Sequence, residues 1–337
     1  MRTSTILLAS LLATSALLGG CKKDDAATGD DGVDSGMGSG SGTDPGAAFT
    51  VQSTDVTIPS GTGNEVTYCY WFKTPNTTAL AINKWVSDMA PGSHHMIFFA
   101  GGSFPPDLPN GGLDTQNRCG LGTSSGTNQP AWVFASQTLH LEEDLPADDG
   151  TGKPLAQVIE PGTVGAIQMH YLNATDSALT AHVKLSAYAL ADGATYTRTD
   201  PYITYNYDIS IGPNATGVQA TASCPTPAGA KFWTMSTHSH KQSVETQISD
   251  TNGMILDSHD WEHPTVKTWD SMPFYTVNGN LTWTCTYDNT GDNKGSTVVQ
   301  GASAATNEMC MATGYFFPST KAQFCVSGHA FNGCYCL

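Results

Sequence analysis

Short runs of residues that alternate between polar and apolar side chains constrain this fold more than any other feature of the chain. They include residues 65–72 (EVTYCYWF), 182–188 (HVKLSAY) and 280–287 (NLTWTCTY). β-Branched and aromatic side chains suit a pleated surface, and a period of two places the apolar ones on one face of a strand. Turn residues such as those at 110–112 (NGG) and 278–280 (NGN) separate the runs. The sequence therefore predicts an all-β protein of paired sandwiches, with one short helical candidate at residues 78–88.

The first 48 residues are predicted to lie outside this fold. Residues 1–20 carry one positive charge, a short apolar run and small residues at the end, which is typical of a secretory signal peptide. Residues 18–21 (LGGC) resemble a bacterial lipobox, which would make Cys21 the lipidated first residue of an exported lipoprotein, periplasmic or at the cell surface. An ordinary signal peptide that contains a cysteine is the alternative. Residues 21–48 are rich in Gly, Ser and Asp and predict a flexible tether.

The charge balance excludes some classes of partner. The formal net charge is −16, yet only 13% of residues are charged, and the 14 Lys and Arg residues are not clustered. This composition argues against binding to nucleic acid or to an anionic membrane surface. No later apolar run is long enough for a transmembrane helix, so membrane contact is expected only through Cys21.

The cysteines predict disulfide bonds. Nine cysteines less Cys21 leave eight, and an even number in an exported chain favours disulfides over free thiolates. Each bridge stabilises a fold by ~2–4 kcal/mol. The eight are Cys69, Cys119, Cys224, Cys285, Cys310, Cys325, Cys334 and Cys336.

Two histidine groups lie in the first half of the chain. His94 and His95 are adjacent, and neighbouring side chains on a strand point to opposite faces, so both can bind one ion only at a strand end or a bulge. Residues 91–93 (PGS) supply such an irregular start. His170 lies in the middle of a predicted strand. Three imidazoles suit copper, zinc, nickel or iron, although a His-His pair is as often a surface or packing feature.

A third group lies in the second half. His238 and His240 are two residues apart and therefore project from the same face of a strand, as a bidentate metal site requires. Met309, in the segment 307–310 (NEMC), would add a soft thioether ligand, which favours Cu(I). The alternative for Met309 is an ordinary core side chain.

Taken in order, these motifs resemble the copper type II, ascorbate-dependent monooxygenases, a family that includes peptidylglycine α-hydroxylating and dopamine β-monooxygenases. The segments 94–96 (HHM), 168–171 (QMHY), 237–240 (THSH) and 308–310 (EMC) follow the order of the family's motifs at similar intervals. Residues 283–289 (WTCTYDN) are similar to the family's segment upstream of its Met ligand. The resemblance covers most of residues 49–325.

The resemblance implies a fold, an activity and two metal sites. Two antiparallel jelly-roll sandwiches in tandem, 49–203 and 204–337, would each carry one copper and face each other across a solvent-filled cleft. The enzyme, a monomer, would hydroxylate a C–H bond of a small organic substrate with O₂ and an external reductant, ascorbate or another one-electron donor. The electron-storing copper would be held by His94, His95 and His170. The copper that binds oxygen would be held by His238, His240 and Met309. Gln168 matches a residue lining the cleft, and its alternative is an ordinary polar strand residue.

The resemblance also implies disulfide pairings. Cys69 would pair with Cys119, and Cys285 with Cys310. Cys224 would pair with Cys325 or a later cysteine, and Cys334 and Cys336 lie beyond the resemblance.

Substrate recognition departs from the peptide-amidating members. These have an Arg where Ser236 stands and a Tyr where Thr313 stands, so a peptide ending in glycine is not the expected substrate. One interpretation of residues 259–263 (HDWEH) is that they line the cleft or bind a further metal. The other is a turn between strands with solvated histidines, and the following Pro264 favours this turn. His140, His182 and His329 are isolated and are assigned no role.

Two other functions use the same sequence features. A non-catalytic exported copper-binding lipoprotein would need the same six ligands. A purely structural β-sandwich lipoprotein would leave those ligands unexplained.

Overall fold

The computed structural model describes residues 44–61, 64–120, 130–173, 175–328 and 333–336. The predicted signal peptide, Cys21 and most of the predicted tether lie outside the described residues. Within the described part the chain consists of strands and turns, and it contains no helix able to cross a membrane.

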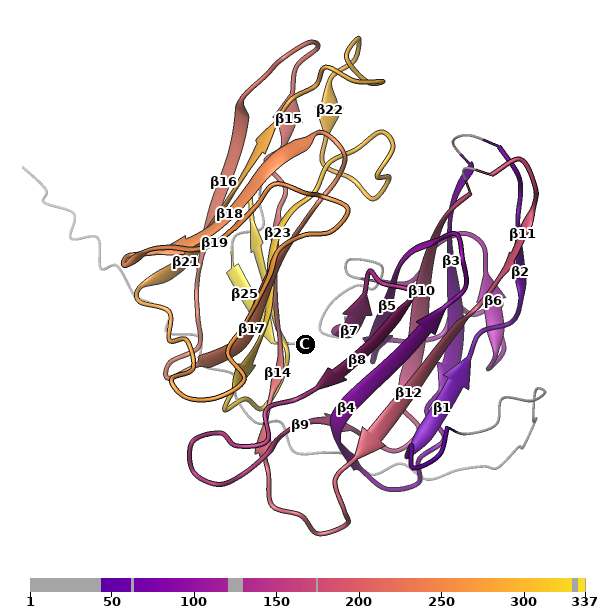
Figure 1. Cartoon of the computed structure of the whole chain (residues 1–337), viewed down its shortest axis with the longest axis vertical. Coiled ribbons are helices and arrows are strands. Elements are labelled where there is room, and N and C mark those ends of the chain that lie inside the picture. The colour runs from indigo at the N-terminus through magenta and orange to yellow at the C-terminus, as the bar shows by residue number, and fades with distance from the viewer. Residues whose placement is uncertain (1–43, 62–63, 121–129, 174, 329–332, 337) are drawn as a thin grey trace, which may run out of the picture. The chain divides into compact units, whose positions relative to one another are not determined.

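The N-terminal half is a jelly roll (Figure 1). Its eight main strands in chain order are β1 (Phe49–Gln52), β3 (Asn64–Lys73), β4 (Leu80–Met89), β5 (Ser93–Ala100), β7 (Ala131–Ser136), β9 (Leu155–Ile159), β10 (Val164–Asn173) and β12 (Val183–Ala189). One sheet has the order β1-β12-β4-β9 and the other β3-β10-β5-β7. If the strands are numbered one to eight, these orders are 1-8-3-6 and 2-7-4-5, the arrangement of two Greek keys rolled into one sandwich. The remaining strands are β2 (Val56–Ile58), β6 (Gly112–Asp114), β8 (His140–Asp144), β11 (Leu179–Ala181) and β13 (Thr197–Arg198).

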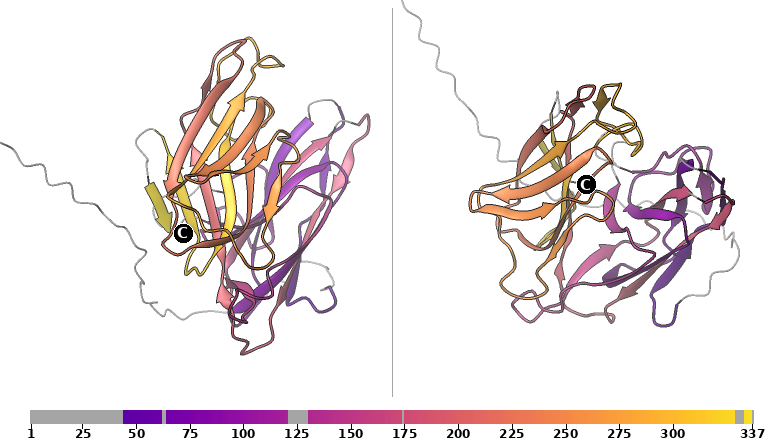
Figure 2. Two further views of the ribbon diagram at one scale, coloured as in Figure 1. Left: turned by 60° about the vertical axis from the view of Figure 1, so that its left-hand side comes forward. Right: turned by 45° about the horizontal axis from the view of Figure 1, so that its top comes forward.

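The C-terminal half repeats this topology (Figure 2). Its eight main strands are β14 (Asp200–Asn206), β16 (Val218–Pro225), β17 (Lys231–Ser239), β18 (Ser243–Asp250), β19 (Gly253–Ser258), β20 (Val266–Thr268), β21 (Asn280–Tyr287) and β23 (Cys310–Phe317). The orders β20-β17-β23-β14 and β16-β21-β18-β19 are again 6-3-8-1 and 2-7-4-5. The remaining strands are β15 (Ser210–Ile211), β22 (Val298–Val299), β24 (Gln323–Ser327) and β25 (Gly333–Cys336). The prediction of two jelly rolls in tandem is confirmed. Among the named strands of the described residues, only β9–β13 and β14–β24 pair in parallel.

Two sequence predictions differ from the structure. The helical candidate at 78–88 was wrong, because this segment forms β4, which pairs with β12, β8 and β9. Its buried residues Ile82, Trp85 and Met89 have helical spacing, but pairing on both sides of the strand overrides that local signal. The predicted boundary after residue 203 falls inside β14. Strand pairing changes from the first jelly roll to the second at Thr199, between β13 and β14.

Each jelly roll has an aromatic core. In the first, Trp85 packs against Phe98 and Phe134. In the second, Trp283 and Tyr287 are fully buried. The first core also includes Trp233, Phe274 and Phe317 from the C-terminal half, so the two jelly rolls share apolar contacts.

Three disulfide bonds tie the described residues together. Cys69–Cys119 and Cys285–Cys310 pair as the resemblance implied, and Cys224 pairs with Cys325 rather than with a later cysteine. Cys334 and Cys336 lie on β25, but their side chains fall outside the described part of the chain. The prediction of disulfides is confirmed for these six cysteines.

Candidate metal centre

The first three histidines converge because of a β-bulge. On the β5–β10 pair, His95 lies opposite His170 and Ser93 lies opposite Tyr171, so His94 is the extra residue of the bulge. Gly92, at the turn before β5, has a φ of 90°, a backbone conformation that residues with a side chain rarely adopt. The bulge lets two adjacent side chains reach one point, as the sequence required. Each of the three histidines offers one ring nitrogen, and these three nitrogen atoms lie within 4.8 Å of one another.

The hydrogen bonds around this group leave nitrogen atoms free for a metal. His170 Nε2 is 2.7 Å from Glu65 Oε1, so its Nδ1 remains available. His95 Nδ1 is buried and has no hydrogen-bond partner among the described residues. Burial lowers the pKa of His95 well below its ordinary value, and it also lowers the pKa of His94. Neutral imidazoles with a free nitrogen are the form that binds a metal, so this donor set fits one.

The second group lies at the end of β17. The rings of His238 and His240 are 5.4 Å apart, with an interplanar angle of 88°. His240 Nδ1 lies 3.0 Å from the Asn307 carbonyl oxygen and donates to it when protonated, which leaves Nε2 free. Burial lowers the pKa of His238 to about 3 and that of His240 to about 4. Both side chains are therefore neutral metal donors at neutral pH.

Met309 is fixed by its surroundings. Its successor Cys310 is cross-linked to Cys285, and the Tyr287 hydroxyl donates a hydrogen bond of 2.8 Å to the Met309 carbonyl. These contacts fix the backbone at Met309 and do not involve its sulfur atom.

Two carboxylates that support the ligands were missed by sequence reasoning. The fully buried Glu308 accepts hydrogen bonds from the backbone N–H of His240 at 3.0 Å and of Gln242 at 2.7 Å, and so it ties the His240 turn to Met309. Burial raises the pKa of Glu308 to about 7, against the effect of these hydrogen bonds. The bond to His170 lowers the pKa of Glu65. In the sequence, only its position next to Met309 indicated a supporting role for Glu308. Nothing in the sequence indicated such a role for Glu65.

Candidate ligands of both groups, all except His94, line one cavity. It has a volume of about 320 Å³, and its lining includes His95, His170, His238, His240, Met309 and Gln168. The ring centroids of His95 and His238 are 6.1 Å apart, in an edge-to-face contact. The expectation of two sites facing across a solvent-filled cleft therefore needs correction for this structure, because these two rings are direct neighbours. Gln168 donates to Asn117 Oδ1 at 2.8 Å and lies on the cavity wall.

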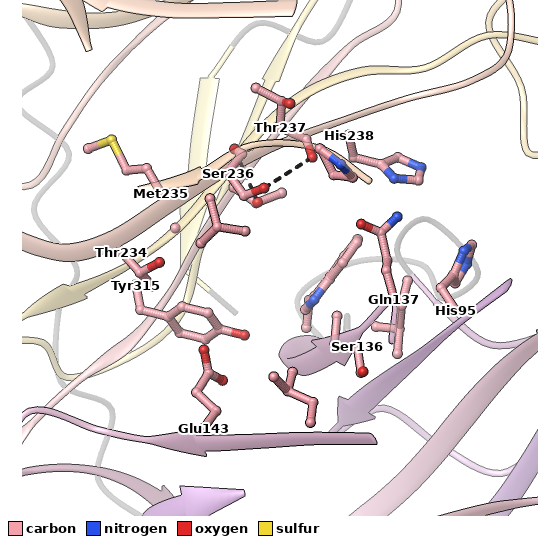
Figure 3. Close-up of a pocket in the computed structure, with 18 of the residues that line it drawn as sticks. His95, Ser136, Gln137, Glu143, Thr234, Met235, Ser236, Thr237, His238 and Tyr315 are labelled. Carbon is pink, nitrogen blue, oxygen red and sulfur yellow. Dashed lines mark hydrogen bonds between the residues drawn. The ribbon is translucent and has the colours of Figure 1, made fainter. Parts of the chain in front are cut away.

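A second cavity of about 310 Å³ lies on the other side of these rings. It shares His95, Ile97, Trp132 and His238 with the first cavity. Its other walls include Glu143 from the first jelly roll and Tyr315 from the second (Figure 3). Ser236 and Thr313, which replace the Arg and Tyr of peptide-amidating enzymes, line this cavity as well.

The segment 259–263 combines two of the predicted alternatives. It forms an irregular turn, and the side chains of His259 and His263 are 65% and 70% exposed. Nevertheless, His263 lines the second cavity, and the Trp261 ring lies 5.5 Å from that of His94. Ligand atoms of Glu245, Asp257 and His259 also lie within 4.8 Å of one another on the surface.

The isolated histidines remain outside the centre. His140 and His182 are exposed and pair with Asp88 and Asp55. His329 lies outside the described residues.

Comparisons with known proteins add little to this geometry. No family model and no curated protein sequence matches the chain. Among solved structures, PBCV-1 VP54, fitted into a reconstruction of the virophage Sputnik, is 8% identical over 79% of this chain and 93% of that chain, with a TM-score of 0.25. The major capsid protein P2 from bacteriophage PM2 is 5% identical over 78% of this chain and 97% of that chain, with a TM-score of 0.30. Likenesses this weak carry no argument about function.

Proposed function

We propose that this protein is a copper-dependent monooxygenase that hydroxylates a C–H bond of a small organic molecule, with O₂ and an external one-electron reductant such as ascorbate. One observation carries the proposal: His95 and His170 of the three-histidine set line the same cavity as His238, His240 and Met309, with His95 and His238 in ring contact. Two chemically different sets suit a division of labour, whereas a copper store needs only one strong soft site.

The donor sets fit two copper ions. His94, His95 and His170 would hold one, and His238, His240 and Met309 the other. Copper bound there would supply one-electron transfer and the activation of oxygen. The soft thioether favours the reduced ion, which is the state that reacts with O₂.

The protein's own groups orient these ligands. Glu65 bonds to Nε2 of His170 and so directs Nδ1 of that ring toward the metal site. Glu308 fixes the His240 backbone relative to Met309. Burial keeps His238 and His240 neutral, so no proton competes with a metal for the free nitrogen at neutral pH. The second cavity would hold the substrate beside His238.

We further propose that the enzyme works outside the cytoplasm as a monomer anchored through Cys21. Three disulfides are consistent with an oxidising compartment.

The test is reductant-dependent oxygen uptake. The purified chain without its signal peptide, loaded with copper and given ascorbate, should consume oxygen in a substrate-dependent way across a panel of small apolar molecules. His238→Ala should abolish this uptake. His182→Ala, which removes an exposed histidine paired with Asp55, should leave it unchanged. Two bound coppers with no substrate-dependent uptake would favour the copper-binding protein without turnover.

A further inference from the structure

The second cavity has a largely apolar surface, with hydroxyl and amide side chains among its lining residues. Apolar residues from both jelly rolls contribute to its wall: Ile97, Trp132, Leu141, Ile203 and Val266. Figure 3 shows Glu143 and Tyr315 together on one side, away from His95 and His238. Among the described residues, no Lys or Arg lines the cavity.

Glu143 occupies an inward position of β8. Along this strand His140, Glu142 and Asp144 are exposed, whereas Leu141 and Glu143 are partly buried and line the cavity. The exposed side chains take part in surface ion pairs, such as Lys84–Glu142 at 2.6 Å. The inward position beside Leu141 is one where stability alone would favour an apolar side chain.

The Glu143 carboxyl group has no partner. No hydrogen bond or ion pair within the described residues reaches it, and burial alone raises its pKa to about 7. Burial, followed by the nearby Glu143 carboxylate, raises the pKa of Tyr315 well above its ordinary value. A partly buried carboxyl group without a partner is unfavourable, and one that lines a cavity is a candidate for binding a ligand.

We propose that this cavity is the substrate pocket and that it takes a small molecule with an apolar body and a hydrogen-bond-donating end group, which Glu143 and Tyr315 hold away from His238. The proposal rests on the proposed function for the role of the bound molecule as a substrate. The donating group is a hydroxyl, an amide or an amine. Molecules that end in a carboxylate bind more weakly, because they repel the ionised fraction of Glu143 and find no Lys or Arg among the described residues that line the cavity.

With the polar end anchored at Glu143, the apolar body extends along the wall toward His238. A bound carbon chain would then present C–H bonds, rather than its polar group, to the metal centre. Anchoring a remote group to position a reacting one is the usual use of such binding energy.

The experiment measures the binding of four probes that differ only in their end group: 3-phenylpropan-1-ol, 3-phenylpropylamine, 3-phenylpropionate and propylbenzene. Titration calorimetry and ligand-observed NMR on the copper-loaded chain, without reductant, should show the alcohol or the amine binding at least tenfold more tightly than the other two. Comparison of the affinities of the alcohol and the amine shows which hydrogen-bond donor the pocket prefers. Without reductant there is no turnover, so a failure of the oxygen-uptake test would not affect this result.

Variants make the result specific. Glu143→Leu should abolish the preference for a donor, and Tyr315→Phe should reduce it about threefold while removing only a hydroxyl. Glu142→Gln, the outward neighbour on β8, is the matched control and should keep the full preference. Equal binding of all four probes to the native protein would overturn the proposal, and so would a preference that survives Glu143→Leu.

Discussion

The two jelly rolls share one topology but build their candidate metal sites on different sheets. The first places its ligands on β5 and β10, the fourth and seventh strands of the 2-7-4-5 sheet. The second places His238 on β17 and Met309 just before β23, the third and eighth strands of the other sheet. These two sheets meet where Trp132 of the first half packs with Met311 of the second. The contact between the halves, rather than the topology within each, therefore decides which strands carry ligands.

The two sites differ in the backbone that brings their ligands together. In the first jelly roll a bulge at His94 brings adjacent side chains together. In the second, His238 lies on a regular strand and His240 follows its last residue, Ser239. The supporting carboxylates differ as well. Glu65 is hydrogen-bonded to the side chain of His170, whereas Glu308 accepts a hydrogen bond from the backbone N–H of His240.

The largest expected effect is the loss of one bound copper ion when a ligand of one site is replaced. The chain should bind two copper ions, and His94→Ala and His238→Ala should each remove one. The reason is that the six ligands divide into two sets, one on each jelly roll. Copper analysis after dialysis against a weak chelator measures the count. Two tightly held coppers in either variant would mean that the ligand assignment is wrong.

A smaller effect is expected from the supporting carboxylates. Glu65→Gln should weaken copper at the three-histidine site by roughly 10–100-fold and leave the other site unchanged. Glu308→Gln should weaken the other site instead, because the amide keeps one acceptor oxygen and turns its NH₂ group toward one of the two backbone donors, His240 N–H or Gln242 N–H. Competition with a Cu(I) chelator gives both affinities. Equal weakening of both sites by one variant would show that the two jelly rolls do not hold their metals independently.

The smallest effect is a pH dependence that originates in the first jelly roll. Burial raises the pKa of Glu143 from 4.5 to about 7, so the folded state holds a proton that the unfolded state releases. This contribution to stability is complete below pH 4.5 and is lost as the pH rises through 7, an effect on the order of 2 kcal/mol. Urea unfolding between pH 4.5 and 8 measures this effect as a difference: the free energy of unfolding of the native protein should fall relative to that of Glu143→Gln, because Glu308, His238 and His240 contribute equally to both proteins. Glu142→Gln should follow the native protein, and parallel curves for the native protein and Glu143→Gln would contradict the assignment.

Sequence reasoning predicted the all-β fold class and the convergence of His94 and His95 for physical reasons, and it failed elsewhere for equally physical ones. Alternation within residues 280–287 is a local signal, and it predicted β21 correctly. The adjacent pair at His94 required a bulge, and β5 has one. By contrast, β4 is a strand only because of its neighbours, and no local pattern distinguishes its apolar spacing from that of a helix.

The functional residues that were missed depend on distant partners. Glu143 is one of several acids in residues 142–144, and only the pairing of β8 with β4 turns it inward. Glu65 meets His170 across a separation of 105 residues. The sequence of a single chain does not contain that information.

The central claim is turnover rather than storage of copper, and the substitution Met309→His tests it most directly. A store should accept a third histidine as well as a thioether, whereas an oxygen-reactive site depends on the soft ligand. The Cys285–Cys310 bridge and the Tyr287 hydrogen bond should hold the new side chain in place. We expect two coppers per chain in the variant, with ascorbate-dependent oxygen uptake reduced about tenfold, equivalent to ~1.4 kcal/mol of barrier. Uptake equal to that of the native protein, or no uptake by either across a broad substrate panel, would contradict the claim.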